Sequence, residues 1–140
     1  MSKEERDRIA LRSAVIFLRI ALGIGYLSAV ADRFGLWGPF GTESVAWGNF
    51  HNFVAYTGKL NPWCPAGLVP TLSWIATVAE TVIGVVLISG FFRRIVALLS
   101  GLLSLTFAIA MTVVLGVHAP LNYSVFVVAA ASFVLAAIRD

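Results

Sequence analysis

Charged residues are scarce in this sequence, and their scarcity decides its class. Only 12% of the residues are Asp, Glu, Lys or Arg, whereas an average soluble domain has roughly 25%. Hydrophobic residues make up 59% of the chain. A chain of 140 residues with that composition lacks the polar surface that a water-soluble domain needs. We therefore expect a single membrane domain over residues 1–140, with no appended soluble module.

Cysteine is almost absent, and so are the groupings that carry redox cofactors. The single cysteine, Cys64, excludes an internal disulfide and a C-x-x-C redox pair. His51, Cys64 and His118 match no metal-ligand spacing, so we predict no metal site. The sequence also has no paired histidines placed to ligate haem and no glycine-rich nucleotide loop. No catalytic centre is evident in the isolated chain, and whether it is an enzyme stays open.

Long apolar runs are abundant. About 20 apolar residues are enough to span the hydrocarbon of a bilayer, and four runs, approximately 13–31, 71–92, 95–117 and 121–138, meet that length. Short second and third connections predict an all-α membrane protein, an antiparallel bundle of four transmembrane helices. The first run resembles a signal peptide ending in Ala29-Val30-Ala31, but Arg19 inside it favours a retained helix.

The third run carries a row of small residues at every fourth position. Such a row lets neighbouring helices approach closely in lipid. It consists of Ser100, Ser104, Ala108, Thr112 and Gly116.

The first connection, residues 32–70, is long enough to hold structure of its own. Within it, residues 42–57 predict an amphipathic helix that lies at the membrane interface, with Thr42 as N-cap and Gly58 as stop. All four tryptophans fall in or beside this segment, as expected for an outer aromatic belt: Trp37, Trp47, Trp63 and Trp74.

The positions of the cations predict the orientation. Arg33 and Lys59 are the two that fall on the side of the long connection. Seven flank the apolar runs on the other side: Lys3, Arg6, Arg8, Arg12, Arg93, Arg94 and Arg139. Because positive residues are retained on the cytoplasmic side, we expect a multi-pass protein of the cell (inner) membrane with both termini cytoplasmic. Cations that flank apolar runs do not predict binding to nucleic acid.

Glu80 stands alone in the middle of the second apolar run. A carboxylate at that depth is costly and is kept where it faces protein, water or a partner charge. Arg19 and Tyr26 lie on one face of the first predicted helix, seven residues apart. We predict that Glu80 faces Arg19 or a polar cavity between the first two helices. Such a pair either binds a polar ligand or relays protons, or it only fixes the register of the two helices.

The chain resembles the DoxX family of small four-helix membrane proteins. The resemblance lies in the segments Arg19-Ile20-Ala21-Leu22-Gly23, Ala79-Glu80-Thr81-Val82-Ile83-Gly84, Leu87-Ile88-Ser89-Gly90-Phe91-Phe92-Arg93-Arg94 and Phe107-Ala108-Ile109-Ala110-Met111. The family takes its name from membrane subunits associated with thiosulfate:quinone oxidoreductase. The resemblance therefore implies a membrane subunit, with quinone as the candidate cofactor.

The expected function is that of a non-catalytic membrane subunit. It would bind a small ligand or a redox partner through its outer half, besides contacting the bilayer and a second copy of itself. One alternative is a quinone-linked subunit of a thiosulfate or sulfur oxidoreductase; another is a small-molecule transporter, although no inverted repeat or broken helix is present. The candidate ligand-binding residues are Arg19, Glu80, Tyr26, Trp74, His51, Asn49, Asn122 and Tyr123.

Overall fold

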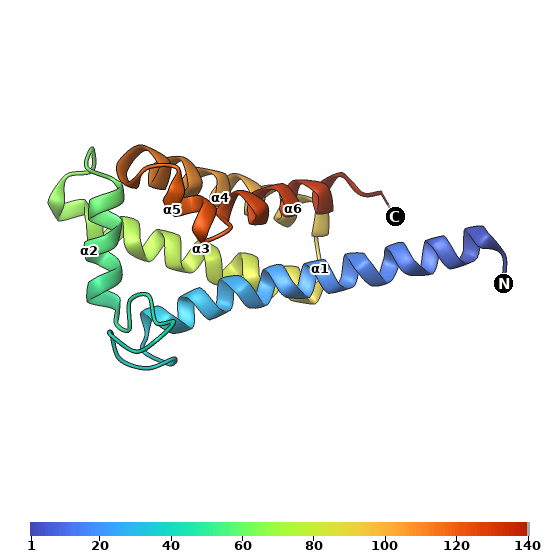
Figure 1. Cartoon of the computed structure of the whole chain (residues 1–140), viewed down its shortest axis with the longest axis horizontal. Coiled ribbons are helices and arrows are strands. Elements are labelled where there is room, and N and C mark those ends of the chain that lie inside the picture. Colours follow the sequence, from blue (N-terminus) through green and yellow to red (C-terminus); the bar gives the residue numbers. More distant parts are fainter. Residues whose placement is uncertain (140) are drawn as a thin grey trace.

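A computed structural model describes residues 1–139, which are largely helical and contain no strand. Asp140, the last residue of the predicted domain, lies outside the described residues. Figure 1 shows α1, α3, α4 and α6 extended along the long axis of the molecule, with α2 across one end. The elements are α1 (Lys3–Arg33), α2 (Phe50–Leu60), the 3-10 turn η1 (Ala66–Leu68), α3 (Val69–Ser89), α4 (Arg93–Leu115), α5 (His118–Asn122) and α6 (Val125–Ala137).

Three segments are long and apolar enough to cross a membrane, namely Lys3–Arg33, Ala66–Ser89 and Arg93–Leu115. They correspond to the first three predicted spans, so the expectation of a helical, multi-pass membrane type is confirmed. The first helix begins ten residues earlier than the predicted span at 13. Ser2 caps it, because its hydroxyl accepts from the Glu5 N–H at 3.1 Å. The charged lead is therefore helical, and it projects beyond the other helices in Figure 1.

The fourth predicted span, 121–138, is divided in the structure. Helix α5 ends at Asn122, and α6 begins only at Val125. Between them Ser124 has a left-handed backbone, with φ of 56°, which interrupts the run of helical residues. Pro120 lies inside the short α5. The resulting α6 has 13 residues and is shorter than α1, α3 or α4.

Helices α4 and α6 pack closely through small residues. The hydroxyls of Ser100 and Ser132 are 2.8 Å apart. A Cβ placed on Gly101 would lie 2.6 Å from the ring of Phe133, so only glycine admits that ring. In the predicted row of small residues, Ser100, Ser104 and Ala108 are buried. The row therefore serves packing within the chain.

Helices α1 and α3 touch at a pair of glycines. A Cβ on Gly23 would lie 2.7 Å from the carbonyl oxygen of Gly84. Four residues earlier in α1, Arg19 Nη2 donates to the carbonyl of Ile88 at 3.3 Å, which is four residues later in α3. Contacts therefore advance in opposite directions along the two helices. Counting ten residues from the glycine pair in these opposite directions places Arg33 of α1 level with Trp74 of α3.

The predicted helix over 42–57 is displaced: the structure has α2 at Phe50–Leu60. Asn49, and not Thr42, is the N-cap, since its side chain accepts from the Asn52 N–H at 2.8 Å. Gly58 does not stop the helix but lies inside it. The reason is the loop before α2, where Gly48 has a φ of 71° that ends any helix passing through it.

Candidate functional site

Glu80 lies in the interior of the molecule and pairs with an arginine. Its carboxylate forms an ion pair with Arg33 Nη2. Arg33 is 2% exposed and Glu80 is 3% exposed. Arg33 Nη1 also donates to Thr77 Oγ1 at 2.9 Å, and that hydroxyl donates to the Ser73 carbonyl at 2.8 Å. Glu80 therefore faces protein, but its partner differs from the one expected.

Of the two surroundings predicted for Glu80, the pairing with Arg19 is wrong, and the register of α1 against α3 explains why. Arg19 lies beside Ile88, eight residues and roughly 12 Å beyond Glu80. Arg33 is level with Trp74, six residues and roughly 9 Å on the other side. Because helical side chains lean toward their own N-terminus, Arg33 and Glu80 lean toward each other, whereas Arg19 and Glu80 lean apart.

Helix α2 and the loop before it cover the ion pair with aromatic rings. The Arg33 guanidinium carbon lies 3.7 Å from the centre of the Phe53 ring and 5.2 Å from that of Trp47. A cation over a ring is stabilised by about 2 kcal/mol when both are desolvated. Arg33 Nε has no hydrogen-bond acceptor among residues 1–139, so the ring faces provide part of the cation's surroundings. These rings separate the ion pair from the surroundings at the α2 end.

Asp32 holds this aromatic cover in place. Its carboxylate accepts from the N–H groups of Ala46, Trp47 and Gly48 at 2.8, 2.9 and 2.9 Å. Two consecutive residues at the end of α1 thus do separate work: Asp32 fixes the loop that carries Trp47, and Arg33 pairs with Glu80. Neither role follows from the sequence pattern, because Arg33 ends the apolar run, where an interfacial cation is expected. The available signal was the acid–base dipeptide at the helix end.

Tyr26 forms a second buried polar centre, between α1, α4 and α6. Its hydroxyl lies 3.0 Å from the Ser100 carbonyl oxygen, 2.9 Å from Ser100 Oγ and 2.7 Å from Ser104 Oγ. Ser100 continues the chain of hydroxyls to Ser132 of α6. As a predicted ligand contact, Tyr26 is engaged inside the protein. It joins the α1–α3 pair to the α4–α6 pair.

The other predicted ligand contacts are exposed and do not converge on one cavity. Trp74 packs its ring 4.4 Å from Phe50, and Asn49 is used in capping α2. Asn122 Nδ2 lies 3.3 Å from the Nδ1 of His118. The structure places five of the eight predicted residues on the surface: Trp74, His51, Asn49, Asn122 and Tyr123.

Few ionisable groups gather at this end. Within residues 1–139, no three His, Cys, Asp or Glu side chains lie close enough together to hold a metal ion. Cys64 is half-buried, with its Sγ 3.7 Å from the Pro65 carbonyl oxygen. Burial raises the pKa of the Tyr56 hydroxyl, and the charge of Tyr123 adds to the rise. This end therefore offers aromatic faces and neutral hydrogen-bonding groups.

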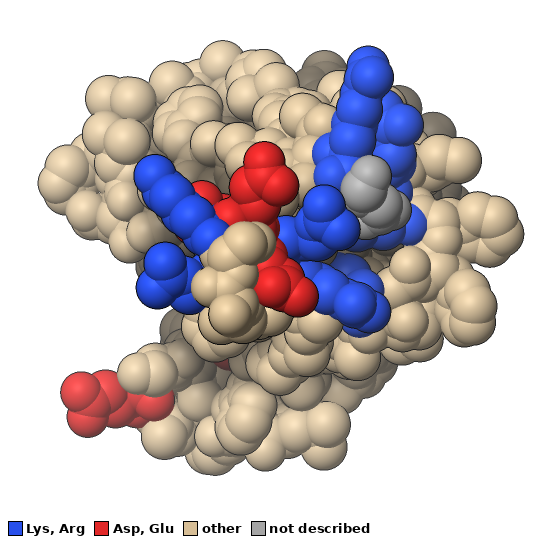
Figure 2. All heavy atoms as spheres, turned by 90° about the vertical axis from the view of Figure 1, so that its right-hand side faces the viewer, with Lys and Arg blue, Asp and Glu red and all other residues tan. Residues whose placement is uncertain are grey.

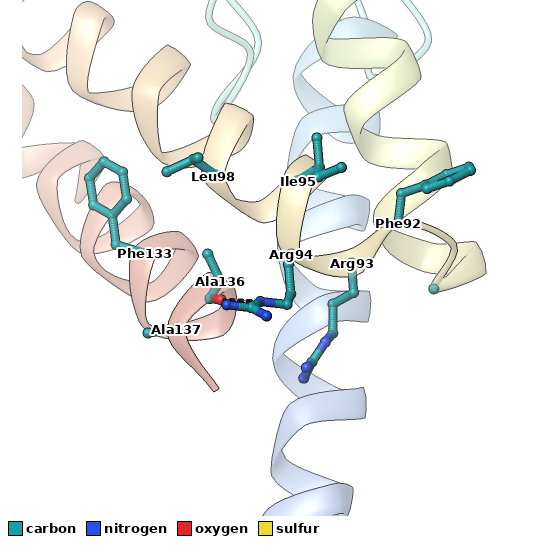
Figure 3. A pocket seen from close by; sticks show the side chains of 9 residues that line it. Phe92, Arg93, Arg94, Ile95, Leu98, Phe133, Ala136 and Ala137 are labelled. Carbon is teal, nitrogen blue, oxygen red and sulfur yellow. Dashed lines mark hydrogen bonds between the residues drawn. The ribbon is translucent and has the colours of Figure 1, made fainter. Parts of the chain in front are cut away.

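The opposite end carries an open groove lined by arginines (Figure 3). Its volume is about 850 Å³, and Gly90, Ile95, Leu98 and Phe133 form part of its wall. Arg94 Nε donates across it to the Ala136 carbonyl at 3.4 Å. Arg93 Nη2 donates to the Ile138 carbonyl at 2.8 Å. Figure 2, which views this end, shows lysine and arginine side chains gathered on it, with a smaller number of acidic side chains among them.

Chemically, the two buried centres can hold helices in register, while the two ends present different surfaces. The α2 end presents aromatic rings, and the other end presents cations. Comparisons with protein-family models, with curated proteins and with solved structures found no match to this chain. The function is therefore argued from this geometry.

Proposed function

We propose that the chain is a non-catalytic integral membrane subunit of the DoxX type, which binds a small ligand or a redox partner through its α2 end. One observation carries the proposal: Glu80 is paired with Arg33 beneath the ring of Phe53. Because the two charges pair with each other and are enclosed, they hold α1, α3 and the α2 cover together. The membrane-embedded carboxylate of Glu80 is therefore not exposed as a free acid.

The α2 end supplies the contacts that such a subunit needs. Trp74, His51 and Tyr123 are exposed there, and the first two lie on α3 and α2, which the buried pair holds together. Aromatic and amphipathic side chains on rigid supports give large contact areas at low entropic cost. A ligand or partner with an apolar face and a few polar groups matches this surface.

The proposed orientation places both termini in the cytoplasm, with α5 and α6 completing an antiparallel four-helix bundle in the inner membrane. Burial of Arg33 supports it, since Lys59 is then the exposed cation of the α2 end in the described chain. Most of the other cations lie at the opposite end (Figure 2). This asymmetry is the one that the retention of positive residues favours. Reporter fusions that place the C-terminus outside, or Lys59 inside, would contradict the orientation.

A quinone-linked subunit is the second candidate, favoured by one feature of the surface. Phe34, Phe50 and Trp74 form an aromatic cluster: the Phe34 and Phe50 rings are nearly parallel at 5.6 Å and 10°, and the Trp74 ring is tilted by 35° to Phe50 at 4.4 Å. Phe34 and Trp74 are also partly open to the surroundings. An exposed aromatic cluster of this kind suits contact with a quinone ring. The electron donor for such a reaction would come from a partner protein.

Purification of the protein alone tests the non-catalytic assignment. Its visible spectrum and its quinone reduction with thiosulfate, sulfite or thiols as donors would be recorded. We expect no bound chromophore and no turnover. Steady turnover that Glu80→Gln abolishes would overturn the proposal and favour the quinone-linked alternative.

Native mass spectrometry from detergent tests the binding surface. We expect a retained small molecule or subunit, lost in Trp74→Ala and kept in Arg94→Ala, because the two residues lie at opposite ends. Equal loss in both variants, or loss in Arg94→Ala alone, would remove the α2 end as the binding surface.

A further inference from the structure

The loop after α1, residues 34–40, exposes apolar side chains that no other part of the described residues 1–139 covers. Leu36 is 76% exposed, Trp37 60% and Phe40 67%. No charged residue occurs between Arg33 and Glu43. Contiguous apolar surface of this kind marks a site of contact with lipid or with another protein. We call this loop the wedge.

The wedge begins at a level inside the length of α3, and not beyond the end at which α3 starts. The end of α1 at Arg33 is level with Trp74, five residues and roughly 7.5 Å into α3. The Phe34 ring lies 6.1 Å from the Trp74 ring, which agrees with that level. Trp37 then turns back along α1 and reaches Ser28, five residues and roughly 7.5 Å before Arg33. If α3 spans the bilayer, Trp37 therefore lies at hydrocarbon depth.

Hydrogen bonds in the wedge suit surroundings without water. The Trp37 Nε1–H donates to both the carbonyl oxygen and the hydroxyl of Ser28, each at 3.1 Å, although the ring is exposed. Four of the six backbone N–H groups in the wedge donate to described residues: Phe34 and Leu36 to Ala31, Gly35 to Asp32, and Gly38 to Gly35. Residue 39 is a proline and has no N–H. Irregular backbone at membrane depth needs such internal pairing.

The wedge continues a surface of α1 that faces outward along the span. Phe17, Ile20 and Ile24 are exposed, and they lie on the same side of the helix as Ser28. Trp37 is bound at Ser28, so its ring extends this apolar stripe toward the α2 end. Lipid that covers the stripe would therefore reach the wedge without a break.

We propose that the wedge is inserted among the acyl chains of the leaflet at the α2 end, with Leu36, Trp37 and Phe40 in contact with lipid. The occupant is the bilayer, in preference to a second copy of the chain, because the wedge joins the stripe of a membrane-spanning helix. The proposal depends on the membrane-spanning helices and not on the proposed ligand-binding function. Failure of either proposal leaves the other standing.

Fluorescence quenching in phosphatidylcholine vesicles tests the proposal. One variant keeps Trp37 and replaces the other three tryptophans with phenylalanine; a control keeps only Trp63, which lies in the turn after α2. We expect Trp37 to lose more emission to phospholipid brominated in the middle of its acyl chains than to aqueous iodide, and Trp63 the reverse. Quenching of Trp37 by iodide as strong as that of Trp63 would overturn the proposal. Quenching of Trp37 by neither would also overturn it, since a protein surface would then cover the wedge.

A spin label provides a second reading that leaves Trp47 over Arg33 intact. Leu36→Cys in a Cys64→Ser background would be labelled and compared with Lys59→Cys on exposed α2 surface. We expect the label at position 36 to collide mainly with oxygen, which concentrates in lipid, and the label at position 59 to collide mainly with a water-soluble nickel chelate. If the chelate collided more often than oxygen at both positions, or if neither reagent reached position 36, lipid insertion would be contradicted.

Discussion

The two ends of the molecule use charge in opposite ways. At the α2 end Asp32, Arg33 and Glu80 are buried and bonded to groups of the same chain, and the surface is aromatic. At the other end most cations lie on the surface, around an open groove (Figures 2 and 3), although Arg93 is buried and donates to the Ile138 carbonyl. A charge in an apolar helix is therefore kept where an opposite charge, a hydroxyl and ring faces close around it. Where water or headgroups are available, exposure alone is enough.

Removal of Glu80 should have the largest effect, because it turns the closed end into one with an orphaned charge. Glu80→Leu leaves Arg33 buried without its carboxylate, which costs roughly 3–5 kcal/mol of the free energy of unfolding. The measurement is reversible unfolding in mixed micelles as the fraction of denaturing detergent rises. The matched control at the open end is Arg94→Leu, which removes an exposed cation and should change little. Equal losses in the two variants would contradict the contrast between the ends.

Removal of the Asp32 carboxylate should have the next largest effect. Asp32→Ala leaves the part-buried N–H groups of residues 46–48 without their acceptor, and the loss of hydrogen bonds to a charged group costs about 1–3 kcal/mol. We expect faster amide hydrogen exchange at those three residues as well as lower stability. Glu43→Ala is the control, since Glu43 is an exposed acid of the same loop. Unchanged exchange in Asp32→Ala would show that the carboxylate does not hold the aromatic cover.

Removal of the Tyr26 hydroxyl should have the smallest effect. Tyr26→Phe breaks the bonds to Ser100 and Ser104, but the Ser100–Ser132 contact remains. The expected loss is about 0.5–1.5 kcal/mol in the same unfolding assay. Tyr123→Phe, at an exposed tyrosine, is the control and should show no loss. A loss in Tyr26→Phe as large as that in Glu80→Leu would mean that the two buried centres are of equal weight.

The sequence was sufficient for the apolar helices and for the placement of Glu80. A single carboxylate inside an 18-residue apolar stretch predicts a buried acid, because lipid cannot hold one cheaply. Its partner depended on the register of α1 against α3, which the close approach of Gly23 to Gly84 sets. Sequence spacing within each helix contains no information on that offset. The lean of helical side chains selects Arg33 over Arg19 only once that register is given.

The segment between α1 and α2 was the least predictable from local signals. Thr42 and Gly58 have the residue types of a helix start and stop, yet neither serves as one. The competing interaction is long-range: the carboxylate of Asp32 gathers three N–H groups that a helix over 42–57 would have used internally. In the fourth predicted span, the left-handed backbone of Ser124 has no signal in the sequence, since serine is not a residue that favours it.

A double-mutant cycle on Arg33 and Glu80 tests the pairing most directly. Stability would be measured for Glu80→Leu, for Arg33→Leu and for the combined variant, with Arg19→Leu in place of Arg33→Leu as the parallel cycle. Since replacement of both charges of a buried pair by apolar residues is often neutral, the Arg33 and Glu80 double variant should be more stable than either single variant. The Arg19 cycle should be additive, because residues that share no partner do not couple. Additivity for Arg33 together with coupling for Arg19 would contradict the ion pair beneath α2 and restore the pairing expected from the sequence.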